Sequence, residues 1–419
     1  FDSLSERVQN IEAFQERTGD QLTFAVEGLK ARFVGTLSSD GRQAVGHWLQ
    51  SGGKFALTLD RTDTEEKPRE RKRPQTPQPP YSYRTKEVQF PSRAAGVSLA
   101  GTLTLPPPSS APLSKRFPVV VFATGSGPQD RDETLLGHKP FLVLADHLTR
   151  NGIATLRFDD RGVGKSTGNH ATATTVDFAD DVLGAIEFLT EQPEIDPQRI
   201  GILGHSEGGI IGPMAAAKDD RVAFLIMLAG PAVTGAEIMA KQGELIGLAS
   251  GLSRAVLDSE LALQQAMIDA LRSSSADESP QKIVEHAISQ FLGKLAEDQR
   301  AAATPSDIKQ QALEQLTLPW FRFFLTHDPK QDLVKIKIPV LALFGEKDLQ
   351  VDPEQNVGPM KQAFSQAGNS HATVTVLPGL NHLFQPAQSG APAEYDTIEQ
   401  TMAPAVLDAI TTWIQSLGK

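Results

Sequence analysis

The feature that most constrains the fold of this chain is a regular alternation of short apolar runs with longer stretches of helical periodicity. The runs are strand-length, rich in β-branched residues and apolar on both faces: FPVVVFATG at 117–125, IATLRFDD at 153–160, RIGILGHS at 199–206, VAFLIMLAG at 222–230, IPVLALFGEKD at 338–348 and ATVTVLPG at 372–379. Helical periodicity lies between them, over residues 139–151, 175–192, 353–367 and 397–417. Strands buried on both faces belong to a parallel sheet covered by helices, so we predict a doubly wound α/β domain.

One long interval, from about residue 233 to 335, interrupts this alternation. It holds no strand-like run and is rich in the helix-forming residues Ala, Leu, Gln, Glu and Lys. Because it is too long for a connecting loop, we interpret it as several helices inserted between two strands of the sheet. An insertion at the carboxyl end of a strand lies over the edge where such sheets bind ligands, so the sequence predicts a helical cap.

Residues 1–62 show a pattern typical of antiparallel strands. Apolar and polar residues alternate in LTFAVEGL, ARFVGTLS, QAVGHWLQ and KFALTLD, with SSDGR and QSGGK as turns, which predicts a small antiparallel β domain. Residues 63–83 are charged and proline-rich with almost nothing to bury, and we interpret them as a linker. The predicted α/β domain then occupies residues 84–419, and a chain of 419 residues fits two domains better than one.

Composition excludes several classes of function. A formal charge of −11 disfavours a nucleic-acid surface, and no apolar run is long enough to span a bilayer. The absence of cysteine removes disulfides, thiolate metal sites and cysteine nucleophiles. The chain starts FDSLSERVQN, without an initiator Met or a signal peptide, as a mature or trimmed product would, so the missing signal does not indicate the cytoplasm.

Two stretches share the spacing Gly-x-Ser-x-Gly, which exposes a nucleophilic serine on a tight turn: GVGKSTG at 162–168 and GHSEGG at 204–209. The first also ends like a phosphate loop, but the position that requires glycine holds Asp159, whose carboxylate would repel phosphate. TGNHATATT then delays the helix, and DDR separates the strand from the turn. We therefore interpret GVGKSTG as a loop that Asp159, Asp160 and Arg161 fix by local bonds, and we disfavour a nucleotide-binding function.

GHSEGG has the structural context of a nucleophile elbow, because RIGIL predicts a strand directly before it and GGIIGPMAAAK predicts a helix directly after it. Ser206 would occupy the apex of the turn. Gly204 and Gly208 omit side chains that would collide where the strand meets the helix. A serine hydroxyl is a poor nucleophile at neutral pH, so it needs a base and a group that orients the base.

The expected order along the chain in such a fold is serine, acid, histidine. Asp348 ends VLALFGEKD at the carboxyl end of a strand, and His382 lies just past the next strand, in VTVLPGLNHLF. Both side chains would face one crevice with Ser206. Asp352 is the fallback acid, whereas His371 precedes its strand and would lie at the wrong end of the sheet.

An oxyanion hole needs two backbone donors. We nominate the amide of Glu207, directly after the nucleophile, and the amide of Ser126 in the loop ATGSGPQDRDE, with Gly127 as second choice. The carboxylate of Glu207 either serves the structure or meets a cationic group of the substrate.

The cap contains an aromatic cluster in LPWFRFFLTHDP at 318–329. Trp320, Phe321 and Phe324 are candidates for lining an acyl or aryl pocket. The alternative is that these rings form the core of the cap itself.

Five of these stretches, GSGPQDRDE, FDDRGVGKSTG, IGILGHSEGG, LFGEKDLQV and GLNHLF, resemble a bacterial α/β-hydrolase family. Its members are serine esterases or acyl hydrolases related to dienelactone hydrolases and serine aminopeptidases. The resemblance covers most of residues 84–419, is weakest in the cap, and implies the same triad and oxyanion hole. Dienelactone hydrolases use a cysteine nucleophile, so their substrate is not implied for this cysteine-free chain.

The stretch GTLSSDGRQAVGHW also resembles the small β domain that precedes the hydrolase in such proteins. In that domain FDSL is similar to internal sequence, which implies that strands and an export signal are missing upstream. The resemblance therefore implies a periplasmic or secreted protein.

We predict an α/β-hydrolase fold carrying a serine hydrolase that cleaves small-molecule carboxylic esters through an acyl-enzyme, without metal or organic cofactor. A peptidase or aminopeptidase on the same triad is the alternative within enzymes, and it would need acidic side chains in the cap to hold a substrate ammonium. A catalytically inactive interaction module is the alternative from another class. Homodimer formation stays open, as does the role of the β domain in docking or dimerisation.

Overall fold

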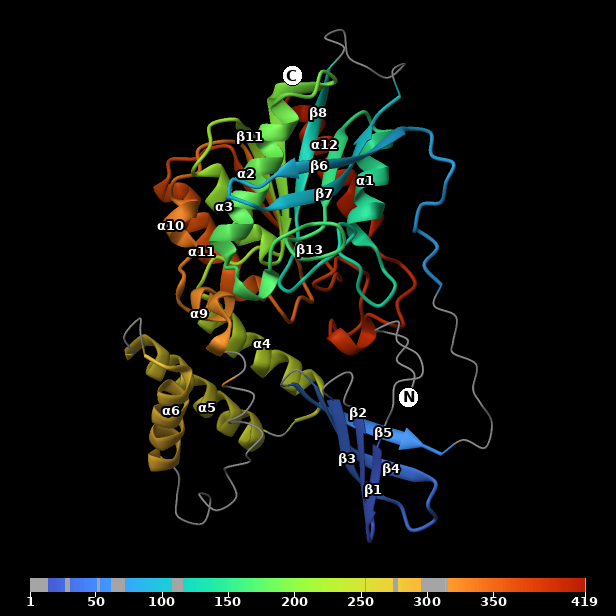
Figure 1. Cartoon of the computed structure of the whole chain (residues 1–419), viewed down its shortest axis with the longest axis vertical. Helices are drawn as coiled ribbons and strands as arrows, with labels where there is room; N and C mark the ends of the chain where they lie inside the picture. Colours follow the sequence, from blue (N-terminus) through green and yellow to red (C-terminus); the bar gives the residue numbers. More distant parts are fainter. Residues whose placement is uncertain are drawn as a thin grey trace. The chain divides into compact units, whose positions relative to one another are not determined.

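The computed structural model describes residues 14–26, 31–50, 53–61, 72–107, 116–252, 254–273, 278–294, 313 and 316–418. The chain divides into two compact units, one made of Phe1–Arg71 and Ser273–Thr317, the other of Lys72–Arg272 and Leu318–Lys419 (Figure 1). Parts of the predicted turn at 50–54, of the linker at 63–83 and of the cap at 233–335 lie outside the described residues. The domain limits derived from the sequence stay a prediction.

The first unit contains an antiparallel sheet of five strands in chain order. The strands are β1 Phe14–Thr18, β2 Gln21–Val26, β3 Ala31–Leu37, β4 Gln43–Gln50 and β5 Gly53–Asp60. Leu22, Phe33 and Ala44 form its buried centre. The predicted meander is confirmed for β2 to β5, whereas β1 escaped prediction because its sequence, FQERT, has one apolar residue and no alternation.

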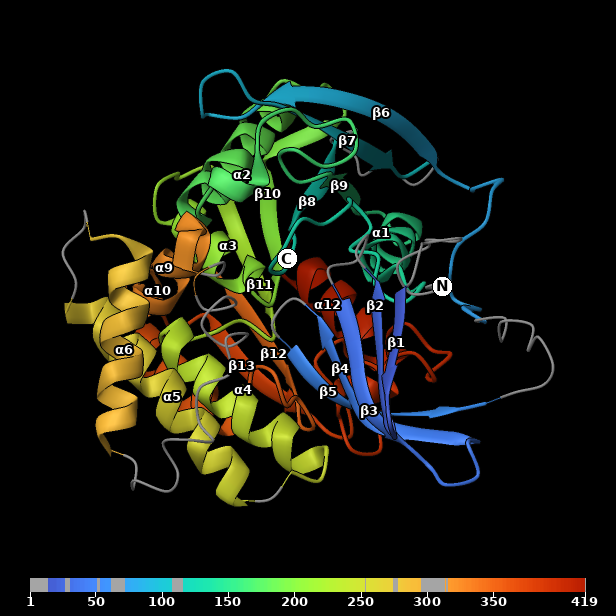
Figure 2. The same ribbon diagram turned by 60° about the horizontal axis from the view of Figure 1, so that its bottom comes forward.

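An eight-stranded sheet forms the centre of the second unit, in the order β13-β12-β11-β10-β8-β9-β7-β6 (Figure 2). The strands are β6 Arg84–Pro91, β7 Ser98–Leu105, β8 Phe117–Ala123, β9 Ala154–Phe158, β10 Ile195–His205, β11 Val222–Leu228, β12 Val340–Gly345 and β13 Ala372–Leu377. The six neighbouring strands β13, β12, β11, β10, β8 and β9 pair in parallel, whereas β7 is antiparallel to both β6 and β9. The predicted parallel sheet is confirmed.

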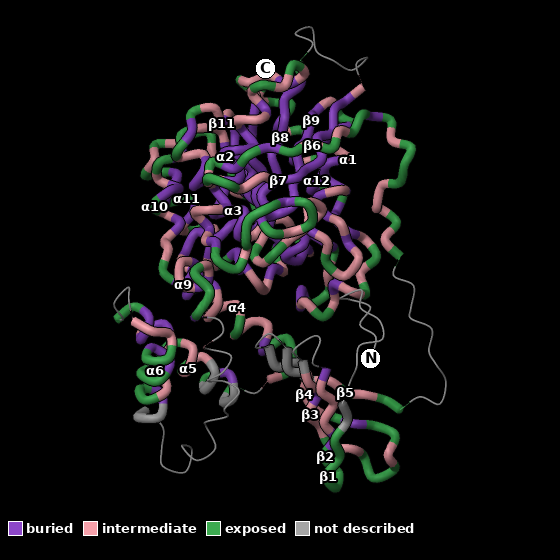
Figure 3. Tube along the Cα trace, viewed as in Figure 1, coloured by how far each residue is buried: buried purple, intermediate pink, exposed green. Residues whose placement is uncertain are grey.

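The centre of this sheet is buried on both faces. Every residue of β8, β9 and β12 is buried, as continuous apolar runs predict. Figure 3 shows the buried, purple interior of this unit. β13 departs from this pattern, because it is an edge strand in which Thr373, Thr375 and Val376 are exposed. The prediction that ATVTVLPG is buried on both faces was therefore wrong.

Helices cover both faces of the sheet. α1 and α12 pack together against one face, and the successive contacts of α2, α3, α10 and α11 form the layer on the other (Figure 2). Their bounds are α1 Pro140–Arg150, α2 Thr175–Thr190, α3 Gly208–Ala216, α10 Lys330–Leu333, α11 Pro353–Gln366 and α12 Pro404–Ser416, with short 3₁₀ turns at His170–Thr172 and Pro392–Glu394.

The last helix begins later than the predicted residue 397. Pro404 stands in its first turn, where a missing amide proton is tolerated. The preceding amides of Thr401 and Met402 donate to Gln75 Oε1 at 2.7 and 2.9 Å instead of entering a helix. Residues 397–403 were therefore wrongly predicted as helical.

The described part of the predicted cap is helical and contains no strand. Besides the short α10, its described helices are α4 Gly235–Ala249, α5 Arg254–Ser273, α6 Pro280–Lys294, which lies in the first unit, and α9 Pro319–Thr326. α4 packs on α9, where a side chain at Gly235 would overlap the ring of Phe324. Among the described residues, no helix is long and apolar enough to cross a bilayer.

Candidate active site

Ser206 lies on the turn between β10 and α3 and adopts a left-handed φ of 53°. This strained conformation is typical of a nucleophile elbow. The Ser206 amide donates to the carbonyl of Leu228 at 2.9 Å. A Cβ at Gly204 would overlap the carbonyl of Gly208, and one at Gly208 would overlap the carbonyl of Ala123. The two glycines are therefore required where the strand meets the helix, as predicted.

His382 and Asp348 form a buried pair in the loops after β13 and β12. His382 Nδ1 donates to Asp348 Oδ2 across 2.8 Å, and the two residues are 4% and 1% exposed. The other carboxylate oxygen accepts from the amides of Gln350 and Val351 at 2.8 and 2.9 Å, which fixes its orientation. With the proton on Nδ1, the imidazole keeps on Nε2 the lone pair that a general base needs.

The fallback acid, Asp352, and the excluded histidine, His371, make other contacts. Asp352 caps α11 by accepting from the amide of Glu354 at 3.1 Å. His371 is exposed in the turn before β13. Among the described residues, neither side chain forms a hydrogen bond with His382.

His205, which precedes Ser206, brings the turn after β10 next to the loop that holds His382. Its ring centroid lies 4.8 Å from that of His382, and its Nε2 lies 3.0 Å from the His382 carbonyl oxygen. Ser206, Asp348 and His382 follow the carboxyl ends of β10, β12 and β13. Because Ser206 is next to His205 in the chain, the contacts of His205 with His382 also bring Ser206 close to the His382 loop. Their assignment as a catalytic triad stays a prediction.

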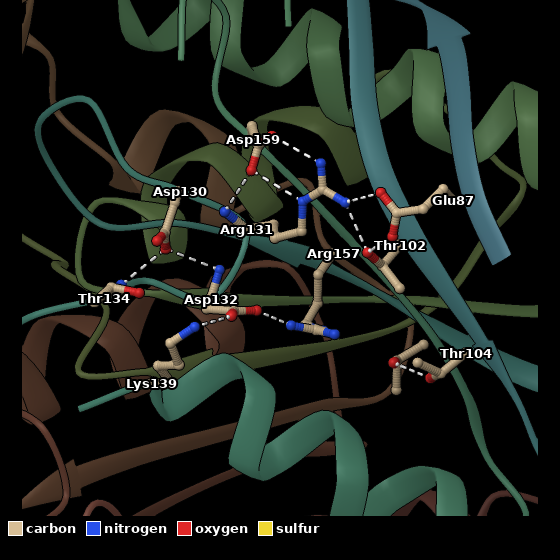
Figure 4. Close-up of polar contacts among 11 residues, drawn as sticks. Glu87, Thr102, Thr104, Asp130, Arg131, Asp132, Thr134, Lys139, Arg157 and Asp159 are labelled. Atoms are coloured by element: carbon tan, nitrogen blue, oxygen red, sulfur yellow. Dashed lines mark hydrogen bonds and ion pairs between the residues drawn. The ribbon is translucent and has the colours of Figure 1, made fainter. Parts of the chain in front are cut away.

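The loop after β8 carries Ser126 and Gly127 and is fixed by four consecutive charged residues, DRDE at 130–133. Figure 4 shows the contacts of the first three, Asp130, Arg131 and Asp132. The bonds are Asp130 with the amides of Asp132 and Thr134, Arg131 with Asp159 and Glu87, Asp132 with Arg157 and Lys139, and Glu133 with His205 and the amide of Gly125. A backbone held in this way is preorganised, as donors to a developing oxyanion must be.

The nominated oxyanion donors are available for a ligand. Among the described residues, the amides of Ser126, Gly127 and Glu207 donate no hydrogen bond to the chain. The amide of Gly125 is instead taken by Glu133 Oε1 at 2.7 Å. A Cβ at Gly125 would stand 3.3 Å from that of Ser206, so this loop runs beside Ser206. The oxyanion roles stay a prediction.

The Glu207 side chain makes contacts that the sequence did not reveal. It is 2% exposed, and its Oε1 accepts from the Thr175 hydroxyl at 2.8 Å and from the Trp320 indole N–H at 2.7 Å. The nearby Ser126 side chain also favours the ionised carboxylate. Burial raises the pKa of Glu207, and Thr175, Trp320 and Ser126 oppose the rise. Glu207 thus connects the elbow, the loop after β8, α2 and the cap helix α9.

The aromatic cluster packs inside the protein. Trp320 stacks on Phe324 with ring centroids 5.3 Å apart, and Phe324 belongs to the main hydrophobic core. Phe321 and Phe324 are each 9% exposed. Phe324 and Trp320 therefore contribute to the main core of the second unit. A core of the cap itself and a role in lining a substrate pocket both stay predictions.

The competing stretch GVGKSTG forms a structural loop. Ser166 is buried, and its hydroxyl donates to the carbonyl of Asp159 at 2.7 Å and accepts from the amide of Ala100 at 2.9 Å. The predicted local bonds are present, since the Asp159 and Asp160 carbonyls accept from the Ser166 hydroxyl and the Val163 amide. The side chains of Asp159, Asp160 and Arg161 also bind partners remote in sequence: Arg131, Thr124 and Asp181. The following α-helix, α2, begins only at Thr175. These contacts differ from those of both an elbow and a phosphate loop.

Removing one donor to Glu207 is expected to destabilise the protein more at high pH than at low pH. Trp320→Phe keeps a ring but deletes the N–H, and loss of a hydrogen bond to a buried acceptor costs about 1–3 kcal/mol. Because the pKa of Glu207 is raised, the native protein keeps this proton at a pH where the unfolded chain releases it, so stability falls as pH rises through that range. Without the Trp320 donor the pKa of Glu207 rises further, so the loss of stability with rising pH becomes larger. Urea unfolding at about pH 5 and about pH 8 measures it.

Glu207→Gln is the matched control for this prediction. Glutamine keeps an acceptor oxygen for Thr175 and Trp320 but does not titrate. In the Glu207→Gln background, the loss caused by Trp320→Phe should be equal at both pH values. An equal loss in the wild-type background would contradict the role given to the Glu207 carboxylate.

Comparison with known proteins identifies similar sequences and structures. A family model described as serine aminopeptidase, S33, matches residues 139–385, a span that contains Ser206, Asp348 and His382. Esterase EstD from Thermotoga maritima is 25% identical over 320 residues, which cover 75% of this chain and 65% of EstD. The chain thus matches slightly less than two thirds of that relative's length.

Two solved structures cover most of the chain at low identity. Est1E from Butyrivibrio proteoclasticus aligns with a TM-score of 0.46 and 19% identity over 79% of this chain and 98% of that chain. The α/β hydrolase GrgF from Penicillium sp. sh18 aligns with a TM-score of 0.48 and 17% identity over 80% of this chain and 98% of that chain.

Proposed function

Because the chain belongs to the serine aminopeptidase S33 family of α/β hydrolases, we propose that it hydrolyses small-molecule carboxylic esters through an acyl-enzyme on Ser206. The observation that carries the proposal is the buried 2.8 Å hydrogen bond from His382 Nδ1 to Asp348 Oδ2, beside the turn that holds Ser206. This pair supplies a base and a counter-charge for the imidazolium that forms during attack. Similarity to Esterase EstD supports an ester as the substrate.

In the proposed reaction, Ser206 Oγ attacks the ester carbonyl carbon while His382 Nε2 takes the hydroxyl proton. Asp348 stabilises the imidazolium, and the amides of Glu207 and Ser126 hold the oxyanion. The tetrahedral intermediate collapses, and the leaving alcohol receives the proton from His382. Water then attacks the acyl-enzyme with the same base and releases the carboxylic acid.

The surroundings of Glu207 favour an ester over an aminoacyl amide. An aminopeptidase needs a carboxylate that can reach the ammonium group of its substrate. Glu207 stands directly after the nucleophile, but its side chain is buried and accepts hydrogen bonds from Thr175 and Trp320. This carboxylate is therefore already used by the protein, and the amide reaction lacks an anchoring group at this position.

A substrate panel tests the proposal. It comprises p-nitrophenyl esters of graded acyl length, aryl esters, lactones and aminoacyl p-nitroanilides. We expect the highest kcat/KM on an ester and no turnover of the anilides above the Ser206→Ala background. A higher kcat/KM on an anilide would favour the peptidase alternative.

Fluorophosphonate labelling distinguishes the esterase from a catalytically inactive interaction module. An activated Ser206 reacts covalently with the probe, because the base and the oxyanion donors also promote attack on phosphorus. We expect labelling at Ser206, located by peptide mass. A chain that neither labels nor turns over any ester would support the interaction module.

A further inference from the structure

Both ring nitrogens of His205 face hydrogen-bond acceptors. Nδ1 lies 3.0 Å from Glu133 Oε1, and Nε2 lies 3.0 Å from the main-chain carbonyl oxygen of His382. A neutral imidazole has one N–H and can donate to only one of these oxygens, whereas the imidazolium donates to both. The geometry therefore favours the protonated ring.

Glu133 supplies the matching negative charge. Its Oε1 accepts from the amide of Gly125 at 2.7 Å as well as from His205. Its Oε2 is buried and has no hydrogen-bond partner among the described residues. A buried carboxylate with an unbonded oxygen is costly unless a positive charge lies beside it, and the His205 ring is in that position.

The surroundings of the pair strengthen this interaction. Glu133 and His205 border a small pocket whose other walls are largely apolar, Phe141, Leu228 and Phe384 among them. A low local dielectric makes the attraction between opposite charges stronger than in water.

The titratable groups that face His205 are Glu133, Asp348 and the ring of His382. Burial lowers the pKa of His205, but the charge and hydrogen bond of Glu133, the His382 carbonyl and the charge of Asp348 raise it, and the net result is a raised pKa.

We propose that His205 and Glu133 form a buried imidazolium–carboxylate pair that ties the His382 loop and the Gly125 loop to the nucleophile elbow. The proposal rests on the esterase function of the site and makes both residues positioning residues. Through its two bonds, the pair holds the His382 loop and the Gly125 loop in fixed positions relative to Ser206. These positions matter, because a displacement of about 1 Å costs about 10²-fold in rate.

The pair predicts an alkaline limit to activity. Because the pKa of His205 is raised, the doubly bonded arrangement is complete at low pH and is lost as pH rises through that pKa. We therefore expect kcat to fall on the alkaline side, above the ordinary range of histidine.

Two substitutions separate the two bonds of His205. Asparagine places its amide nitrogen near the position of Nδ1 and keeps the bond to Glu133, whereas glutamine reaches the position of Nε2 and keeps the bond to His382. For p-nitrophenyl esters we expect kcat to fall about 10²-fold in His205→Asn and about 10-fold in His205→Gln, with KM changed less than about 3-fold. Thermal melting checks that both variants are folded.

Glu133→Gln gives a readout that a purely structural role would not move. Glutamine keeps an acceptor oxygen for Gly125 and His205 but removes the charge, so His205 releases its proton at lower pH. The alkaline fall of kcat should therefore move down by at least about one pH unit. Asp130→Asn removes a charge from the same loop at a residue that binds the amides of Asp132 and Thr134, and it should leave the position of the fall unchanged.

The pH profile decides the proposal. Superposable profiles for wild type and Glu133→Gln would overturn the positioning pair and leave the esterase function standing. Absence of Ser206-dependent ester turnover in the wild type would instead overturn the esterase function. The rate of Ser206 labelling by a fluorophosphonate, measured over the same pH range, tests the pair independently of ester turnover. A pH dependence of labelling that is the same in wild type and Glu133→Gln would also overturn the pair.

Discussion

Replacing Ser206 with alanine is expected to lower kcat on p-nitrophenyl esters about 10⁶-fold, because the acyl-enzyme cannot form. The oxyanion amides and the substrate contacts remain, so a small rate above that in water should persist. Steady-state assays on purified protein, with circular dichroism to confirm folding, measure the loss. Retention of more than about a tenth of wild-type activity would rule out Ser206 as the nucleophile.

Ser166→Ala is the matched control, since Ser166 is the serine of the other Gly-x-Ser-x-Gly stretch. Its hydroxyl is buried and bridges Asp159 and Ala100, so alanine should cost about 1–3 kcal/mol of folding free energy. We expect kcat and fluorophosphonate labelling to be unchanged. Probe attached to Ser166 would show that the wrong turn had been assigned to the nucleophile.

Asp348→Asn is expected to lower kcat about 10⁴-fold while leaving the fold intact. Asparagine keeps an oxygen for the amides of Gln350 and Val351, so the loop conformation persists. Its NH₂ group would face His382 Nδ1 and donate to it, which moves the ring proton to Nε2 and removes the base. The imidazolium would also lose its counter-charge. Pre-steady-state acylation rates measure the defect directly.

Asp352→Asn tests the other acid that the sequence offered. Asparagine caps a helix about as well as aspartate, so the bond to the Glu354 amide and the start of α11 should be retained. We expect kcat to stay within about 3-fold of wild type. A larger loss in Asp352→Asn than in Asp348→Asn would exchange the roles of the two carboxylates.

The sheet could be predicted because its central strands are buried on both faces and therefore carry unbroken apolar runs. The edges were harder to predict. β6 is an edge strand whose residues are largely exposed, and its sequence, RTKEVQFP, has no apolar run to recognise. β13 was found from its β-branched residues, but its exposure depends on lying at the edge, which no local pattern records.

The positions of Ser206, Asp348 and His382 could be predicted because each follows a strand, and parallel strands deliver their ends to one edge. The partners of His205 and Glu207 could not, since Glu133 is 72 residues from His205 and Trp320 is 113 residues from Glu207. One signal was present. Four successive charged residues at 130–133, in a loop that follows a buried strand, indicate that the loop is tied down on several sides.

The contacts of α9 also determine where this insertion can be exchanged. Trp320 reaches Glu207 from α9, and Phe324 packs over Gly235 at the start of α4. None of the residues that the structure describes between these two helices takes part in either contact. Libraries aimed at new substrates therefore have natural crossover points at the end of α4 and the start of α9. A crossover placed inside either helix would change the exchanged segment and, at the same time, the contact of Trp320 with Glu207 or of Phe324 with Gly235.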